Sequence, residues 1–191
     1  MGRINAVRPV KLFCGIIGES DAIMGEARAL LESTFGPVET SGGPFVFDDT
    51  DYYKEEMGPN LLRTFVSFRG WVDPAELAET KVTANGLEER LSASEGGVVK
   101  RRVNLDPGYL GLGKIVLATT KDQYHRIYLG RGIYGEVTLR YRKGLWTPFE
   151  WTYPDYRSGK YKAFFDEVRQ RLVSETDKRR GAGARRAPPG A

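Results

Sequence analysis

An alternation of apolar and polar residues between Lys100 and Gly144 constrains the fold of this chain more than any other feature. Residues 133–141 divide into one face with Ile133, Val137, Leu139 and Tyr141 and another with Tyr134, Glu136, Thr138 and Arg140. A period of two is typical of a β-strand with one buried face. Residues 125–129 alternate in the same way, so the stretch predicts two neighbouring strands.

Gly130-Arg131-Gly132 joins these two strands, and a loop this short and rich in glycine predicts a β-hairpin. If all three loop residues are unpaired, Leu129 faces Ile133 and Arg126 faces Glu136. A two-residue loop would shift the register and mix polar with apolar faces, which a sheet with one buried side does not tolerate. We therefore predict the three-residue loop.

Arg126 and Glu136 become predicted partners on the polar face. They are either an ordinary cross-strand ion pair, worth roughly 0.2–1 kcal/mol, which we favour, or a charge pair inside a ligand pocket walled by Tyr128 and Tyr134. His125, the only histidine, falls on the apolar face in this register. A histidine there is either a core residue with satisfied hydrogen bonds, which we favour, or a chemical group.

The segment Val103–Leu110 reads as a strand that runs into a turn at Asp106-Pro107-Gly108. In such a turn Asp106 would bond to nearby backbone, which accounts for it without a catalytic role. Lys114 then precedes a short apolar strand at Ile115–Ala118.

The N-terminal part predicts a strand and a helix. Residues 10–17 are apolar on both faces, as expected of a central strand covered on both sides. Ser20 is expected to cap a helix that ends at Gly36-Pro37. The glycines of Gly15-Ile-Ile-Gly18 suggest a phosphate-binding turn between strand and helix, but the segment lacks GxxxxGK[ST] and GxGxxG.

Further strands are expected at 45–47, at 61–68 and around Val103, with a helix at 83–93. This order is the β-α-β-β-α-β of a split βαβ pattern. We predict an α+β fold with a mixed, largely antiparallel sheet, in which a βαββαβ (ferredoxin-like) start is extended by a β-hairpin or meander and a C-terminal helix. The core stripe of that helix consists of Tyr161, Phe164, Phe165, Val168 and Leu172.

Carboxylates are concentrated after Phe47, at Asp48, Asp49, Asp51, Glu55 and Glu56. Hard divalent cations bind through several such oxygens, so Asp48, Asp49 and Asp51 are candidate metal ligands. The same cluster suits the start of a helix, where negative charge complements the helix dipole, and we favour this second interpretation. The sequence does not identify a cofactor.

An aromatic segment precedes the last helix and contains Trp146, Phe149, Trp151, Tyr153 and Tyr156. Aromatic side chains beside basic residues can stack nucleic-acid bases. More often such a segment seals one face of a sheet, and we favour that interpretation.

The positive charge of the chain lies at its C-terminal end. The net charge is +4, yet residues 178–191 contain five Lys and Arg and no acidic residue. Residues 1–177 therefore carry 24 of the 29 basic residues against all 25 acidic ones. We predict one globular domain over 1–177 and a disordered basic tail over 178–191 that either contacts RNA weakly or acts as a solubilising extension.

The sequence favours a cytoplasmic protein. Cys14 is the only cysteine, so no internal disulfide forms. No apolar run approaches the ~18 residues of a membrane span, and the first residues lack the apolar core of a signal peptide. We expect no membrane partner.

Several separate words resemble the bacterial family catalogued as domain of unknown function 4416, from about Val10 to Leu172. They are PFVFDDTDYYKEEMG, NLDPGYL, LATTKD, HRIYLG, GIYGEVTL and WTYPDYRS. The resemblance implies a compact bacterial protein without an established activity, so it supplies no site residues. The arginine-rich tail departs from the family pattern.

The function remains a choice among hypotheses, because HExxH, CxxC and GxSxG are absent. The first is a polar pocket beside the sheet that binds a small anionic ligand, such as a phosphorylated metabolite or nucleotide, with acid–base chemistry if it is an enzyme. Candidate catalytic residues are Glu136, Asp106 and His125. Candidate ligand-binding residues are Arg102, Asn104, Lys114, Arg126, Tyr128 and Tyr134. The alternatives are a non-enzymatic RNA- or protein-binding module and a purely structural protein, and the oligomeric state is open.

Overall fold

The computed structural model describes residues 2–50, 52–95 and 98–184. The first part is a βαββαβ unit made of β1 (Lys11–Gly18), α1 (Asp21–Phe35), β2 (Val38–Val46), β3 (Leu62–Phe68), α3 (Leu77–Arg90) and β6 (Val103–Gly111). Short insertions in it are α2 (Lys54–Met57), a 3-10 turn (Pro74–Glu76), β4 (Ala93–Glu95) and β5 (Val98–Lys100). The second part comprises β7 (Lys114–Thr119), β8 (Ile127–Gly130), β9 (Ile133–Arg142), β10 (Leu145–Pro148), α4 (Pro154–Arg157) and α5 (Lys162–Ala184).

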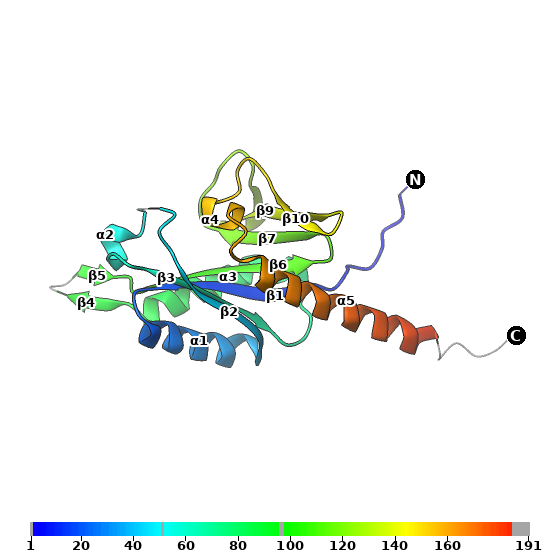
Figure 1. Ribbon diagram of the computed structural model, residues 1–191, viewed down its shortest axis with the longest axis horizontal. Helices are drawn as coiled ribbons and strands as arrows, with labels where there is room; N and C mark the ends of the chain where they lie inside the picture. The colour runs from blue at the N-terminus through cyan, green and yellow to red at the C-terminus, as the bar shows by residue number, and fades with distance from the viewer. Residues whose placement is uncertain (1, 51, 96–97, 185–191) are drawn as a thin grey trace, which may run out of the picture.

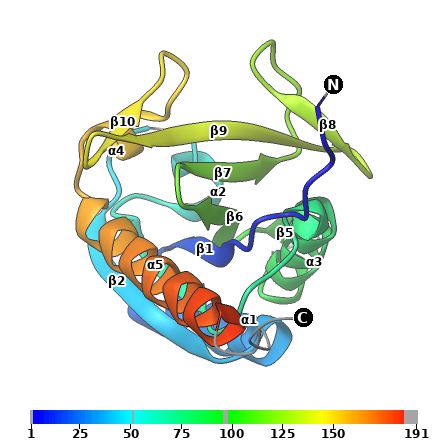
Figure 2. The same cartoon turned by 90° about the vertical axis from the view of Figure 1, so that its right-hand side faces the viewer.

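Eight strands in the described part of the chain form one sheet in the order β10-β9-β7-β6-β1-β3-β2, with β8 paired to β9. Each pairing between these strands is antiparallel. The order β6-β1-β3-β2 is that of a split βαβ, because β3 inserts between β1 and β2. Strands β7 to β10 extend the sheet beyond β6 (Figures 1 and 2). The predicted α+β class, the ferredoxin-like start and the meander are confirmed.

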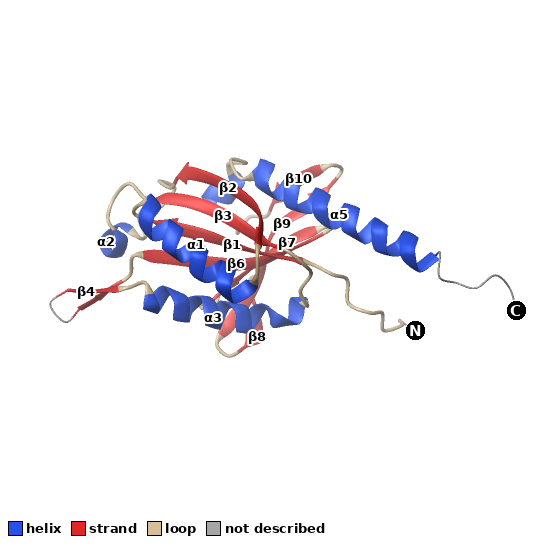
Figure 3. Ribbon diagram, turned by 90° about the horizontal axis from the view of Figure 1, so that it is seen from below, coloured by secondary structure: helices blue, strands red, loops and turns tan. Residues whose placement is uncertain are grey.

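Helices cover both faces of this sheet. α1 and α3 lie side by side on one face (Figure 3), where Leu12 and Ile16 of β1 join the core. α5 covers the other face, where Phe13 of β1 packs with Phe65 and Phe165, the Phe13 and Phe165 ring centroids being 5.3 Å apart. The stripe predicted for the last helix lies in this core. β1 is therefore buried on both faces, as its apolar sequence predicts.

Helix α1 has the predicted ends, whereas β2 and α3 are longer than predicted. The Ser20 hydroxyl accepts from the Ile23 N–H, and Gly36 follows the last helical residue. β2 begins at Val38 and runs through Gly43-Pro44, which is possible because β2 is an edge strand. α3 begins at Leu77 and continues through Asn85-Gly86, since tertiary burial overrides local helix propensity.

The predicted turn at Asp106-Pro107-Gly108 is wrong, because β6 is continuous across it. Pro107 pairs with Cys14 of β1 on one side, and pairing with β7 starts only at Gly108. Proline is tolerated where a strand lacks a neighbour. The glycine turn suggested at Gly15 to Gly18 is wrong as well, since both glycines belong to β1.

The β8–β9 hairpin differs from prediction at its tip. Gly130 rather than Leu129 faces Ile133, so Arg131 and Gly132 form a two-residue turn with positive φ at both positions. Leu129 is a bulged extra residue. The bulge compensates for the shorter loop, and the predicted register beyond it is retained.

A second bulge, at Thr138, overturns the predicted division of β9 into an apolar and a polar face. Val137 pairs with Val116 and Leu139 with Ile115, so Thr138 is the extra residue. One extra residue exchanges the faces. Val137 consequently packs toward α3, whereas Leu139 packs toward α5.

The C-terminal helix is longer than the sequence suggests. Residues 178–184, predicted to begin a disordered tail, continue α5, and residues 185–191 lie outside the described part. In the described residues, no helix has the length and apolar character needed to cross a membrane.

Candidate functional site

A cleft of about 680 Å³ opens where β6 and β7 separate. The two strands pair only between Gly108 and Gly111 of β6, so the first half of β6 has no strand on this side. The cleft lies between α3 on one side and β7, β9 and α4 on the other, with the β2–β3 connection at its mouth. Its lining contains five basic and five acidic residues, so overall charge does not decide which ligand fits.

Arg63 of β3 is a buried cation in the wall of this cleft, with 3% of its surface exposed. Its Nη2 donates to Asp106 Oδ2 at 2.6 Å, and its Nη1 donates to Asp155. The guanidinium lies 5.2 Å from the ring centroids of both Phe47 and Tyr156. Two carboxylates and the ring faces together compensate the burial of the charge.

Gly15 of β1 makes this arrangement possible. It pairs with Phe65 of β3 and with Asp106 of β6, and so lies between the two strands that carry the ion pair. A Cβ atom on Gly15 would lie 3.3 Å from both Nε and Nη2 of Arg63. The missing side chain therefore lets the guanidinium cross β1 to reach Asp106.

Three buried polar atoms of cleft-lining residues have no hydrogen-bond partner among the described residues: Arg63 Nε, Asn104 Nδ2 and the Tyr156 hydroxyl. We call these atoms the open donors. Asn104 Oδ1 accepts from Arg101 Nη1 at 3.2 Å, which assigns the amide NH2 as the unpartnered end. Burial raises the pKa of Tyr156 well above its ordinary value, so its hydroxyl keeps its proton. Each of the three therefore carries a donor hydrogen that no described residue accepts.

Glu136 of β9 also lines the cleft, and its carboxylate is enclosed in a polar cluster. Its Oε2 accepts from Arg126 Nε at 2.8 Å and lies 3.1 Å from His125 Nε2. Arg126 Nη2 donates to the Tyr153 hydroxyl at 2.8 Å. Because Tyr153 lines the cleft and burial raises its pKa, its proton remains available to a ligand.

The predicted partnership of Arg126 and Glu136 forms, but as a buried pair rather than a surface one. His125 does not lie on the apolar face with Ile127. It stacks on Trp151 with ring centroids 5.3 Å apart. β8 begins only at Ile127, so strand alternation does not fix the direction of the His125 side chain.

The α3 side of the cleft adds a second buried charge pair. Lys81 Nζ donates to the backbone oxygen of Leu105 at 2.6 Å and lies 3.6 Å from Glu88 Oε1. Glu88 Oε1 also accepts from the Leu105 N–H at 2.8 Å. Burial raises the pKa of Glu88 above its ordinary value, against the opposing effect of Lys81.

Aromatic and basic residues form the mouth of the cleft. Arg101 donates through Nε to Glu56 at 2.9 Å, and its guanidinium lies 5.3 Å from the Tyr53 ring centroid. Lys121 Nζ lies 3.7 Å from the ring centroid of Tyr52. This contact joins the β7–β8 connection to the β2–β3 connection across the opening.

The structure brings together some of the predicted site residues. Glu136, Asp106 and Asn104 line the cleft, and Arg126 and His125 support Glu136. The other predicted residues lie elsewhere: Arg102 beside Glu19, Lys114 at the far end of β7, and Tyr128 and Tyr134 against each other in the β8–β9 hairpin.

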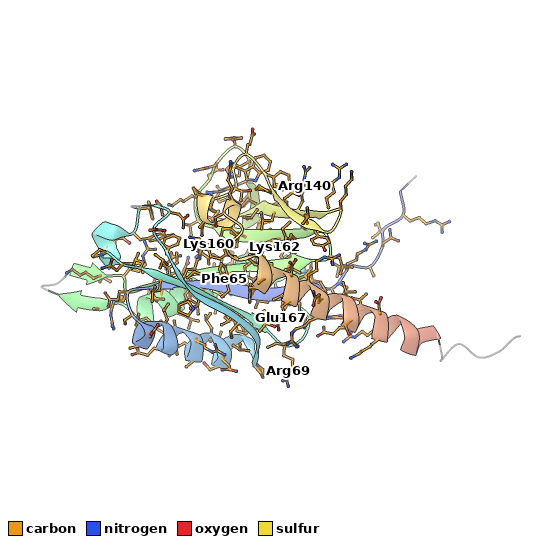
Figure 4. All side chains as sticks on the ribbon, in the orientation of Figure 1. Phe65, Arg69, Arg140, Lys160, Lys162 and Glu167 are labelled. Atoms are coloured by element: carbon orange, nitrogen blue, oxygen red, sulfur yellow. The ribbon has the colours of Figure 1, made fainter. Side chains whose placement is uncertain are left out.

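The predicted metal ligands are not gathered into a site by the described residues. Asp48 is exposed, and Asp49 binds Lys160, which Figure 4 labels near the start of α5. Asp51 lies outside the described residues. No group of three or more His, Cys, Asp or Glu side chains is placed to hold a metal ion within residues 2–50, 52–95 and 98–184.

Sequence reasoning missed Arg63, Lys81 and Tyr156. Arg63 did leave a signal, because it is the only charged residue in a strand predicted to lie inside the sheet. A charge in such a strand must be paired, since an unpaired buried charge is strongly destabilising. Lys81 gave no comparable signal, since its segment reads equally as strand or helix.

The cleft belongs to a chain with one recognisable family relationship. A family model described as "Domain of unknown function (DUF4416)" matches residues 8–172. No curated protein and no solved structure matches the chain.

Proposed function

We propose that this chain, which belongs to the DUF4416 family, binds a small phosphorylated ligand in the cleft between β6 and β7. The open donors are the observation that carries the proposal. Buried polar groups in folded proteins are almost always hydrogen-bonded, and leaving one without a partner costs about 1–3 kcal/mol. Three such groups on residues of one cleft favour a ligand that supplies the missing acceptors.

The chemistry of these groups indicates what the ligand carries. A guanidinium N–H, an amide NH2 and a protonated phenol donate hydrogen bonds, so the matching ligand presents oxygen acceptors. Both the phosphate oxygens and the hydroxyl oxygens of a phosphorylated metabolite are such acceptors. The volume of about 680 Å³ lies within the usual range of small-molecule sites.

Asp106 is the candidate general base if the bound ligand reacts. Its Oδ2 is held by Arg63, whereas Oδ1 makes no hydrogen bond to any described residue. A catalytic base must lie within hydrogen-bond reach of the proton that it takes. Asp106 lines the cleft with 23% of its side chain exposed, so it meets that geometric requirement better than the fully bonded Glu136.

The alternative of an RNA-binding module has less support from the aromatic segment. Trp146 packs on Tyr141 at a centroid distance of 5.0 Å, and Trp151 donates to the backbone oxygen of Val137 at 3.0 Å. Tyr156 lies in the core beneath α5. Trp146 and Tyr156 pack into the core on the α5 face of the sheet, as the favoured interpretation expects, which leaves these two rings less accessible for base stacking.

The proposal can be tested with two tyrosines of the same core that differ in their hydroxyl partners. Tyr156 lines the cleft without a hydroxyl partner, whereas the Tyr161 hydroxyl donates to Asp155 Oδ2 at 3.1 Å. In calorimetric titrations with inorganic phosphate, glycerol 3-phosphate and AMP, we expect the parent protein to bind at least one probe. Tyr156→Phe should weaken that binding about 10-fold, the order of one hydrogen bond to a charged group, and Tyr161→Phe should leave it within about 2-fold.

The unliganded variants provide the internal control. Tyr156→Phe removes an unsatisfied hydroxyl and should melt at or above the parent temperature, while Tyr161→Phe, which loses a bond to a carboxylate, should lose about 1.5–3 kcal/mol of unfolding free energy. Binding of no probe by the parent protein, or equal binding by parent and Tyr156→Phe, would contradict the proposal.

A further inference from the structure

Asn104 and Asp106 present a donor and an acceptor side by side. They are two residues apart on β6 and therefore point to the same face. Both line the cleft, in the half of β6 that has no β7 partner. Asn104 offers its unpartnered NH2 and Asp106 its Oδ1. A hydroxyl group both donates and accepts, so neighbouring hydroxyls match this pair better than a phosphate does, because a carboxylate repels a phosphate.

The phosphate of such a ligand needs a cation that is not already paired with a carboxylate, and the described residues provide one at the mouth of the cleft. Three lining cations are already committed to carboxylates: Arg63 to Asp106 and Asp155, Lys81 to Glu88, and Arg101 to Glu56. Lys121 instead contacts the Tyr52 ring and has no carboxylate partner within the described residues. An ammonium in this setting can bind a phosphate without first giving up an ion pair.

We infer that the cleft takes a sugar phosphate, free or as part of a nucleotide, with its hydroxyl groups on Asn104 and Asp106 and its phosphate at Lys121. This inference rests on the proposed function and specifies the ligand class and its orientation. The open donors of Arg63 and Tyr156 lie on the same face as Asp106 and would bind further ligand oxygens. The exposed ring of Tyr52 at the mouth offers a stacking surface for a base when the sugar phosphate belongs to a nucleotide.

The hydroxyl contacts are tested by titration calorimetry with ribose 5-phosphate and 2-deoxyribose 5-phosphate, and with AMP and dAMP. These pairs differ by one hydroxyl, and comparison between the pairs distinguishes a free sugar phosphate from a nucleotide. We expect the parent protein to bind the hydroxylated member about 10-fold more tightly in at least one pair, as for one hydrogen bond to a charged group. Asn104→Ala should reduce that preference to less than about 3-fold.

The phosphate contact is tested by two lysines that flank the same strand. Lys121 lines the cleft at the C-terminal end of β7, whereas Lys114 lies at its other end outside the cleft. Lys121→Ala should weaken binding of the preferred probe about 10-fold. Lys114→Ala carries the same change of charge and should stay within about 2-fold of the parent.

The outcomes separate this inference from the proposed function. Equal affinity of the parent protein for both members of each pair would overturn the hydroxyl contacts while leaving a phosphate-binding cleft intact. Equal effects of Lys121→Ala and Lys114→Ala would overturn the assigned orientation. If no probe binds, including inorganic phosphate and glycerol 3-phosphate, the proposed function itself fails. The hydroxyl comparison uses the parent protein alone, so it stands even if Asn104→Ala does not fold.

Discussion

Two buried cations on the α5 face of the sheet are each paired with two carboxylates, but only one of them lies in the wall of the cleft. Lys11 of β1 is fully buried, and its Nζ lies 2.8 Å from both Glu39 and Glu175. Arg63 of β3 is likewise held by two carboxylates, those of Asp106 and Asp155. Both clusters join separate strands to a helical segment. The Lys11 cluster lies apart from the cleft, whereas the Arg63 cluster forms part of its wall.

The two clusters differ in how completely their polar atoms are satisfied. In the Lys11 cluster, Glu175 also accepts from Trp71 Nε1 at 2.5 Å, and no atom of Lys11 or Trp71 is among the buried unpartnered atoms found within the described residues. Arg63 keeps an unpartnered Nε, and Tyr156 beside it keeps an unpartnered hydroxyl. A buried charge by itself therefore does not indicate a binding site. Buried polar atoms that lack hydrogen-bond partners and belong to cleft-lining residues do.

The largest expected effect separates these clusters by stability. Arg63→Met would leave Asp155 buried without its cation, and should cost about 3–5 kcal/mol of unfolding free energy. Lys11→Met would leave Glu39 and Glu175, whose side chains are 13% and 33% exposed and can relax toward water. Its expected cost is about 1–3 kcal/mol. Chemical denaturation of both variants checks the difference.

Arg63→Lys is a milder substitution that keeps the comparison testable if Arg63→Met does not fold. A lysine keeps the charge, but cannot bridge two carboxylates as a planar guanidinium does. We expect this variant to fold with reduced stability and with impaired binding of the preferred probe, while Lys11→Met binds normally. Equal losses of binding in both would mean that the comparison reflects stability alone.

Local sequence patterns predicted some parts of the fold and not others. Periodicity predicted the order βαββαβ and the pairing of Arg126 with Glu136, because both follow from local alternation. It failed at Asp106, where a turn motif was overridden by pairing with β1, and at Thr138, where one bulged residue exchanged the faces of β9. Such bulges depend on tertiary packing and leave no periodic signal.

Residues of the candidate site could be predicted from the sequence only where their place on a strand could be predicted. Glu136 was identified as the partner of Arg126 on the polar face of a predicted strand, and Asn104 and Asp106 as polar residues of the neighbouring segment Val103–Leu110. The Arg63–Asp106 pair joins residues 43 positions apart and crosses β1 above Gly15, a contact that local alternation does not indicate. Lys114 and Lys121 both flank β7, and nothing local indicated which of them lies at the cleft.

Glu136→Gln tests whether a fully bonded carboxylate in the cleft behaves like the Lys11 cluster. Glu136 and Arg126 have side-chain exposures of 1% and 3%, so losing the charge should cost about 1.5–3 kcal/mol, the range for hydrogen bonds to charged groups. Thermal unfolding without ligand measures it. A higher melting temperature would instead show that the Glu136 carboxylate lowers the stability of the fold, as functional groups often do. Glu136 would then join Arg63 and Tyr156 as a candidate functional residue.

The smallest effect is expected from Gly15→Ala, which loosens the Arg63 cluster without removing any of its members. A Cβ there would lie 3.1 Å from Phe65 and 3.3 Å from the Arg63 guanidinium, so both side chains must shift by a few tenths of an ångström. Overpacking of this size costs about 1 kcal/mol, and the shift should weaken binding of the preferred probe through Arg63. Gly25→Ala in α1 is the matched control, because nothing lies within 4 Å of its added Cβ and alanine favours a helix. Gly15→Ala could instead lose stability and keep full affinity for the preferred probe. The close fit of Arg63 over β1 would then serve stability alone, as the Lys11 ion pairs do, and the unpartnered Nε of Arg63 would have no part in binding.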